Sequence, residues 1–151
     1  MLKSLLPPTS ERVALNTRDD VNQEIQKKIE ARVSRYTGKS KTDISERLTQ
    51  LDRTWDTERL LETNAMILIL IGVILTLSVH YLWVILSGLV AVFMLIHALQ
   101  GWCPPVPIIR RLGVMTATEI EEEKTALKVL RGDFEGVQKE TGAILDRIRM
   151  K

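Results

Sequence analysis

Charged, polar stretches flank one long apolar block in this chain. Residues 60–101 contain Glu62 as their only formally charged side chain. A helix needs roughly 20 apolar residues to cross about 30 Å of hydrocarbon. The block therefore predicts two transmembrane helices, at about residues 60–79 and 82–99, joined by a tight turn. Neither segment contains proline, so each can satisfy its backbone hydrogen bonds as a continuous helix. The alternative is a buried helix pair in a soluble domain.

Helical periodicity continues in the polar stretch before the block. Residues 17–36 repeat apolar side chains mostly every fourth position, with Thr17 as the expected cap. A second helix is expected after Thr42, with the spacing of a short coiled-coil seam. Because no Gly or Pro lies between Lys39 and Gly72, we expect this helix to continue into the first span. The predicted partner-binding stripe consists of Val21, Ile25, Ile29, Val33, Ile44, Leu48, Leu51 and Trp55.

The stretch after the block also predicts helices. Residues 116–131 have capping-box spacing at Thr118 and Glu121, and Gly132 stops this helix. Residues 134–148 form a further amphipathic pattern. The polar helices on both flanks could close into a small bundle or serve as docking faces for a partner.

The predicted fold is an all-α membrane protein: a two-helix transmembrane hairpin with amphipathic cytoplasmic helices on both flanks. The expected regions are a flexible N-terminal tail at 1–16, a cytoplasmic helical region at 17–58, the hairpin at 59–101, an interfacial Cys-Pro turn at 102–115 and C-terminal cytoplasmic helices at 116–151.

Charge predicts the orientation of the hairpin. Residues 1–59 carry 12 Lys and Arg against 10 Asp and Glu, residues 102–151 carry 9 against 8, and the inter-helix turn carries none. By the positive-inside rule, we expect a multi-pass membrane protein with both termini in the cytoplasm. The net charge of +2 is too small to indicate nucleic-acid binding. The expected partners are the lipid bilayer and either further copies of the chain or another membrane protein.

Pairing the two predicted spans gathers polar side chains at the cytoplasmic edge of the bilayer. This membrane-edge polar cluster consists of Glu62, Asn64, His97 and Gln100. Ionisable residues within spans often have functions, and a Glu beside a His could relay a proton. The simpler interpretation is that these groups bond one another or water at the headgroup boundary.

The exit from the second span contains the only cysteine of the chain. Cys103 is followed by three prolines within four residues, and then by Arg110 and Arg111. The two arginines could favour a thiolate at Cys103, which would make these three residues a candidate thiol site. Alternatively, Cys103 is a small apolar residue packed in the turn. One Cys and two His cannot supply four metal ligands, and no cofactor motif is present, so neither a metal nor a cofactor is expected.

Residues 58–116 resemble a bacterial inner-membrane domain of unknown function, the transmembrane domain of YgaP-like proteins. The resemblance rests on two short spans followed by a Gly-x-Cys-Pro and Leu-Gly-Val pattern, specifically on Gly101, Cys103, Pro104, Leu112 and Gly113. The resemblance implies a location in the bacterial inner (cell) membrane and a dimeric anchor beside a sulfur-transfer enzyme. Rhodanese chemistry is not implied, because this chain has no rhodanese domain.

The favoured function is a membrane-anchored structural or adaptor protein, whose cytoplasmic helices mediate self-association or docking of a partner. No motif for enzyme chemistry is present in the sequence. Two alternatives stay open: a thiol or sulfur relay through Cys103 beside a sulfurtransferase, and an oligomeric conductor or transporter of a small ion.

Overall fold

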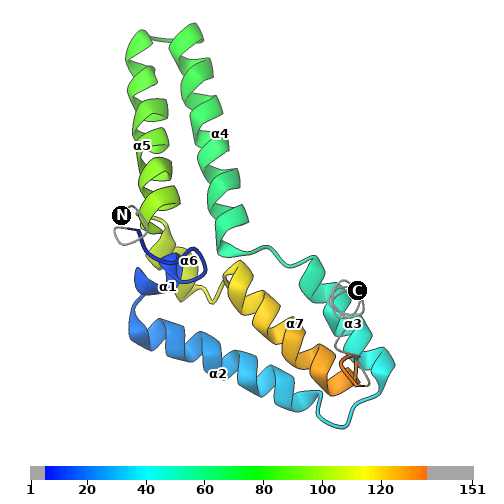
Figure 1. The fold of residues 1–151 in the computed structure, drawn as a ribbon. Helices are drawn as coiled ribbons and strands as arrows, with labels where there is room; N and C mark the ends of the chain where they lie inside the picture. The colour runs from blue at the N-terminus through cyan, green and yellow to red at the C-terminus, as the bar shows by residue number, and fades with distance from the viewer. Residues whose placement is uncertain (1–5, 136–151) are drawn as a thin grey trace, which may run out of the picture. The chain divides into compact units, whose positions relative to one another are not determined.

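The computed structural model describes residues 6–135, which are helical and contain no strand (Figure 1). The elements are α1 (Arg12–Leu15), α2 (Asp19–Arg35), α3 (Lys41–Asp52), α4 (Thr57–Ser78), the 3-10 turn η2 (Tyr81–Trp83), α5 (Val84–Gln100), α6 (Val106–Arg111) and α7 (Ala117–Arg131). They divide into two compact units, which we call the hairpin unit (Met1–Ile25 and Trp55–Ala117) and the polar helical unit (Gln26–Thr54 and Thr118–Lys151).

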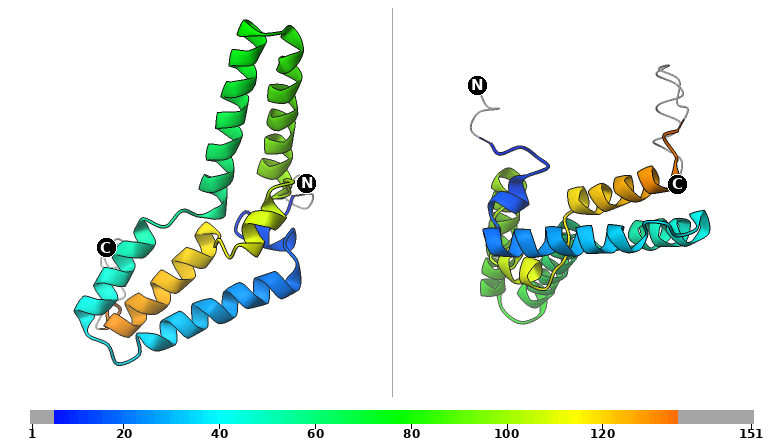
Figure 2. Two further views of the ribbon diagram at one scale, coloured as in Figure 1. Left: turned by 180° about the vertical axis from the view of Figure 1, so that it is seen from behind. Right: turned by 90° about the horizontal axis from the view of Figure 1, so that it is seen from below.

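The hairpin expected from the apolar block is formed by α4 and α5, which lie side by side and are joined through η2 (Figure 1, Figure 2). Both helices are long and apolar enough to cross a membrane. Only 17% of the most apolar window within Lys41–Ser78, which includes α4, and 11% of that within Tyr81–Gln100, which includes η2 and α5, is buried. The helices of a soluble core would bury most of such a window, so this exposure argues against the soluble alternative.

The two helices of the hairpin approach each other closely at one pair of small residues. A Cβ added to Gly72 would lie too near the Oγ of Ser87, so a larger residue at this crossing would displace the Ser87 side chain. Ser87 Oγ in turn donates a hydrogen bond to the carbonyl oxygen of Ile69, at 3.0 Å. Small residues and interhelical hydrogen bonds of this kind hold transmembrane helices together.

The expected continuous helix into the first span is wrong, because α3 ends at Asp52 and α4 begins at Thr57. The side chain of Asp56 caps α4 by accepting a hydrogen bond from the Arg59 amide at 2.6 Å. Thr57 is fully buried, and its amide donates to the carbonyl of Met115 at 2.9 Å. The break therefore depends on a cap and on a contact with a residue distant in sequence.

The remaining elements of the hairpin unit depart from two expectations. Residues 12–15 form α1 rather than an irregular tail, and α6 forms within the expected Cys-Pro turn. Their apolar side chains build one core with the start of α4. This core consists of Val13, Leu61, Cys103, Val106 and Ile109, each at most 8% exposed.

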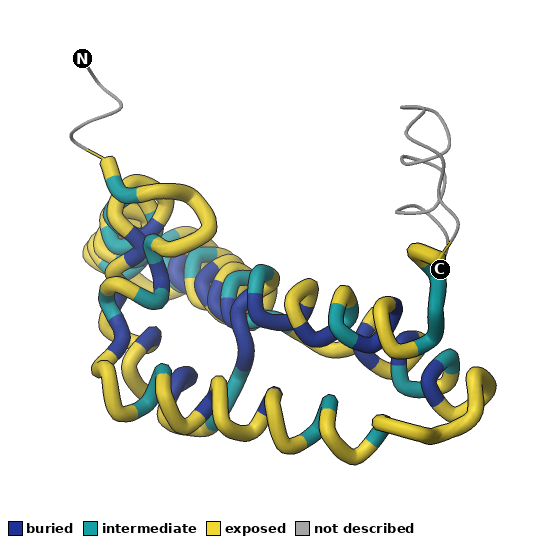
Figure 3. The backbone as a smooth tube through the Cα atoms, turned by 60° about the horizontal axis from the view of Figure 1, so that its bottom comes forward, coloured by how far each residue is buried: buried dark blue, intermediate teal, exposed yellow. Residues whose placement is uncertain are grey.

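The polar helical unit contains the rest of α2 together with α3 and α7. Ser40 caps α3 through a capping box with Asp43, two residues before the expected cap at Thr42. Thr17 does not cap α2 either, because its hydroxyl donates to the Val13 carbonyl at 2.8 Å. Figure 3 shows how buried positions alternate with exposed ones along the helices. Most of the helix expected at 134–148 lies outside the described residues.

Candidate functional site

Cys103 lies inside the hairpin-unit core rather than on the surface. Its side chain is 4% exposed, and burial raises the pKa of the thiol above its ordinary value. An apolar cavity of about 210 Å³ adjoins it, lined by Leu61, Asn64, Ala65, Leu68, Leu89, Val90, Phe93, Met94, Cys103, Pro104 and Pro105. A buried thiol with a raised pKa is a weak nucleophile at neutral pH, so this environment favours a packing role.

The two arginines expected beside the thiol have other surroundings. Arg110 is fully buried, and its guanidinium donates to the carbonyl of Val114 at 3.0 Å and to Oδ1 of Asn22 at 2.9 Å. Asn22 donates in turn to the carbonyl of Ala14, at 2.9 Å. Arg110 therefore connects α6, α2 and α1 within the hairpin unit, while Arg111 is exposed.

The four residues of the membrane-edge polar cluster have different environments. Glu62 and Asn64 are exposed, and Asn64 donates to the carbonyl of Leu60 in its own helix at 2.7 Å. His97 is 2% exposed, and neither of its ring nitrogens has a hydrogen-bond partner among the described residues. Gln100 contributes its carbonyl oxygen, which accepts from the side chain of Asn16 at 2.7 Å.

An interaction that the sequence did not indicate holds α1 against the same end of the hairpin. Arg12 donates to Oε1 of Glu58 at 2.8 Å and to the carbonyl oxygen of Ala98 at 2.9 Å. Glu58, not Glu62, is therefore the acidic residue that pairs with a basic group here. Spacing along the chain could not indicate this ion pair, because Arg12 belongs to the segment expected to be a flexible tail.

The predicted partner-binding stripe is largely covered by the chain itself. Five of its eight members are buried: Ile25, Ile29, Ile44, Leu48 and Leu51. Val21 and Val33 are half-buried, and Trp55 is 46% exposed, with the Arg59 guanidinium 4.9 Å from the centre of its ring. The stripe could either close the helices into a bundle or dock a partner, and its burial within the described residues favours the bundle. Any docking face must then lie on other side chains.

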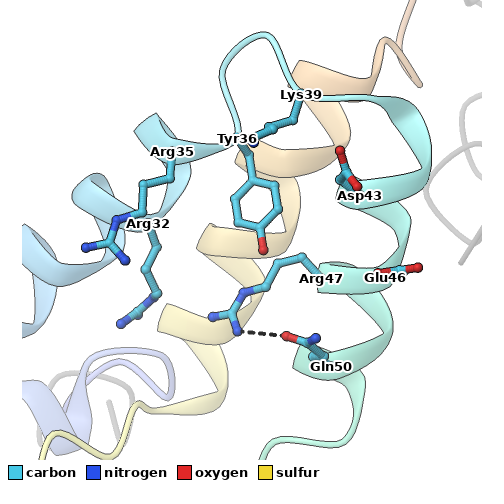
Figure 4. A pocket seen from close by; sticks show the side chains of 8 residues that line it. All are labelled: Arg32, Arg35, Tyr36, Lys39, Asp43, Glu46, Arg47 and Gln50. Atoms are coloured by element: carbon cyan, nitrogen blue, oxygen red, sulfur yellow. Dashed lines mark hydrogen bonds between the residues drawn. The ribbon is translucent and has the colours of Figure 1, made fainter.

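The polar helical unit carries a cleft between the last turn of α2, the loop that follows it and α3, which we call the cationic cleft (Figure 4). Its volume is about 450 Å³. Four basic side chains, two acidic ones, a tyrosine and a glutamine line it: Arg32, Arg35, Tyr36, Lys39, Asp43, Glu46, Arg47 and Gln50. Sequence patterns did not indicate this site, because charged positions on separate helices look like ordinary solvated faces.

Two of these basic residues bind the same buried carboxylate. Glu123 of α7 is 1% exposed. Its Oε2 accepts from Arg32 at 2.9 Å, and its Oε1 accepts from Arg47 at 2.7 Å. A buried carboxylate with two guanidinium partners is strongly held and fixes the positions of both arginines.

The other lining residues are less constrained. Arg35 and Lys39 are exposed, and their side chains have no hydrogen bond or ion pair within the described residues. Asp43 belongs to the capping box of α3, and Figure 4 shows Glu46 directed away from the other side chains. The part of the chain that the structure describes contains no cluster of three or more His, Cys, Asp or Glu that could hold a metal ion.

Comparison with known proteins found no matching family model, no matching curated protein and no matching solved structure. What the structure establishes is a helical protein with two candidate membrane-spanning helices. The resemblance of residues 58–116 to YgaP-like transmembrane domains stays a prediction.

Proposed function

We propose that this chain is a membrane-anchored structural or adaptor protein of the bacterial inner membrane. In this account α4 and α5 cross the bilayer, both termini lie in the cytoplasm, and the polar helical unit docks a second copy or another membrane protein. The observation that carries the proposal is the exposure of apolar side chains along α4 and α5. Leu70, Ile74 and Leu77, for example, are 63%, 54% and 84% exposed.

The surface of α6 supports the same assignment. Ile108 and Leu112 are exposed, as is the neighbouring Arg111. Trp102, at the end of the hairpin, is also exposed, and tryptophan is enriched at membrane–water interfaces. Exposed apolar side chains next to arginine fit the headgroup region of a bilayer, where the guanidinium can reach lipid phosphate.

Two leucines of equal exposure provide a matched test of the anchor. Leu70 in α4 and Leu15 in α1 are each 63% exposed. A charged side chain at the centre of a membrane helix costs about 2.5–3.5 kcal/mol, whereas an exposed leucine in water tolerates arginine. We expect Leu70→Arg to release the chain from membranes on alkaline carbonate extraction, and Leu15→Arg to leave it there. Equal behaviour of the two variants would contradict the anchor.

The docking role needs a separate measurement. We would extract the full chain from native membranes into lipid discs and record the intact mass of the complex by mass spectrometry. The proposal predicts a defined copy number or a stoichiometric protein partner. A single chain carrying lipid alone would contradict docking while leaving the anchor intact.

The thiol-relay alternative requires a different result in the same measurement. It predicts a persulfide or another adduct on Cys103. The burial of this side chain favours an unmodified mass, and we therefore retain the adaptor as the proposed function.

A further inference from the structure

The cationic cleft combines fixed and unpaired basic side chains. Arg32 and Arg47 are held in place by Glu123, whereas Arg35 and Lys39 have no partner within the described residues. Figure 4 shows these side chains around one space between α2 and α3, together with the hydroxyl of Tyr36. Its volume of about 450 Å³ lies within the range of roughly 300–1,000 Å³ typical of ligand pockets.

The cleft already demonstrates which group its arginines bind. One carboxylate, that of Glu123, accepts hydrogen bonds from two guanidinium groups at distances between 2.7 and 3.1 Å. Arginine favours carboxylates because its planar fork matches their two oxygens. Because the side chains of Arg35 and Lys39 have no partner within the described residues, the basic side of the cleft has the capacity for additional carboxylates.

The lining also contains hydrogen-bond acceptors, which restricts the class of ligand. Asp43 accepts from the Ser40 amide at 3.3 Å, and the side-chain carbonyl of Gln50 accepts from Arg47 at 3.4 Å. A phosphate dianion presents mostly acceptor oxygens and offers these groups few hydrogen-bond donors. A peptide presents both backbone N–H donors and, where it carries Asp or Glu, carboxylates, so it can satisfy both kinds of group.

We propose that the cationic cleft binds an acidic peptide segment of a partner protein. The acidic side chains of the segment pair with Arg35 and Lys39 and approach the guanidinium groups of Arg32 and Arg47. The biological meaning of this site rests on the adaptor function proposed above, for which it supplies the chemistry of the partner. Its binding chemistry can be measured independently of that function.

The test uses the full chain in lipid discs and defined synthetic probes. The probes are fluorescein-labelled ten-residue peptides that carry two, three or four glutamates at different spacings on a Gly, Ser and Leu background, each with a glutamine counterpart. Fluorescence anisotropy gives the Kd of each peptide. Sodium pyrophosphate serves as a competitor that tests for phosphate binding.

Two double variants remove the same charge from different places. Arg35→Ala with Lys39→Ala removes two cations from the cleft, and Lys27→Ala with Arg53→Ala removes two exposed cations of the polar helical unit outside it. Neither pair includes the arginines that hold Glu123, so both variants should fold. Circular dichroism checks that their helix content equals that of the wild type.

We expect at least one glutamate peptide to bind about tenfold more tightly than its glutamine counterpart, with affinity falling as salt is raised. The cleft variant should lose that preference, and the control variant should keep it. Three results would overturn the proposal: no peptide preferring glutamate, equal binding by the two variants, or a lower Kd for pyrophosphate than for every peptide. If the cleft variant still forms a complex with a partner, the adaptor function stands and only the proposed binding site is rejected.

Discussion

The carbonyl oxygen of Arg12 lies directly against Gly101, where α5 ends. A Cβ on Gly101 would overlap that oxygen, and its φ of +80° is a conformation that other residues rarely adopt. The backbone of α1 therefore packs on a position that only glycine can occupy. The side chain of Arg12 adds its hydrogen bonds to Glu58 and to Ala98.

We predict that Gly101→Ala releases α1 from the hairpin unit. The left-handed conformation alone costs a non-glycine residue about 1–2 kcal/mol, and the steric overlap adds to it. Gly38→Ala is the matched control, because Gly38 has a φ of +79° but nothing within 4 Å of the added Cβ. Hydrogen exchange of residues 12–16 should accelerate in Gly101→Ala only. Equal exchange in both variants would show that the close approach is unimportant.

The contact between Gly72 and Ser87 leads to a similar prediction within the hairpin, in which two glycine substitutions differ in their effect on stability. Gly72→Ala should lower the thermal stability in detergent, since it displaces the Ser87 hydroxyl from its hydrogen bond to Ile69, worth about 0.6–1.7 kcal/mol. Gly88→Ala, where nothing lies within 4 Å of the added Cβ, should leave the stability unchanged or raise it. Adding Ser87→Ala to Gly72→Ala should recover part of the loss by relieving the overlap. A Gly72→Ala variant as stable as Gly88→Ala would contradict this packing.

We predict that removing the carboxylate of Glu123 lowers the stability of the polar helical unit strongly. Glu123→Ala leaves Arg32 and Arg47 without their shared partner, and breaking such a buried ion pair costs about 3–5 kcal/mol. Glu122→Ala, at an exposed neighbouring position, should change the stability by less than about 0.5 kcal/mol. Thermal unfolding followed by circular dichroism distinguishes them. A mild effect of Glu123→Ala would mean that the two arginines find water or other partners at little cost.

From the buried thiol of Cys103 we predict how the alkylation rate and the stability of the folded chain change with pH. Burial raises the pKa of its thiol, so the folded state favours the neutral form. Alkylation by iodoacetamide should therefore be slower in the folded than in the denatured chain, and it should rise at higher pH. The stabilising contribution of the neutral thiol should be complete below the pKa of the unfolded chain and decline as the pH rises through the raised value. Equal alkylation rates in both states would contradict the buried position.

The sequence predicted the hairpin because two apolar segments of membrane-spanning length need no information beyond their own composition. It missed the end of α3, since the start of α4 depends on a bond from Thr57 to Met115, far along the chain. It missed α1 for the same reason: Arg12 finds its partners on α4 and α5. Local patterns do not contain contacts of this range.

The candidate sites were less predictable than the fold. Periodicity identified Ile29 and Leu48 as apolar positions but could not say whether a partner or the chain itself covers them. The cationic cleft requires α2 and α3 to bring Arg35 and Arg47 together, and a hydropathy pattern treats both as solvated residues. Burial of Arg110 likewise depends on Asn22, which lies in another helix.

The membrane-spanning hairpin is tested most directly by measuring its topology in living cells. In a Cys103→Ser background, single cysteines would replace Arg53, Tyr81 and Arg111, and a membrane-impermeant maleimide would label them before and after permeabilisation of the inner membrane. We expect Tyr81→Cys to react from outside, and Arg53→Cys and Arg111→Cys to react only after permeabilisation. Labelling of the three positions from the same side, or release of the chain by alkaline carbonate, would contradict a membrane-spanning hairpin.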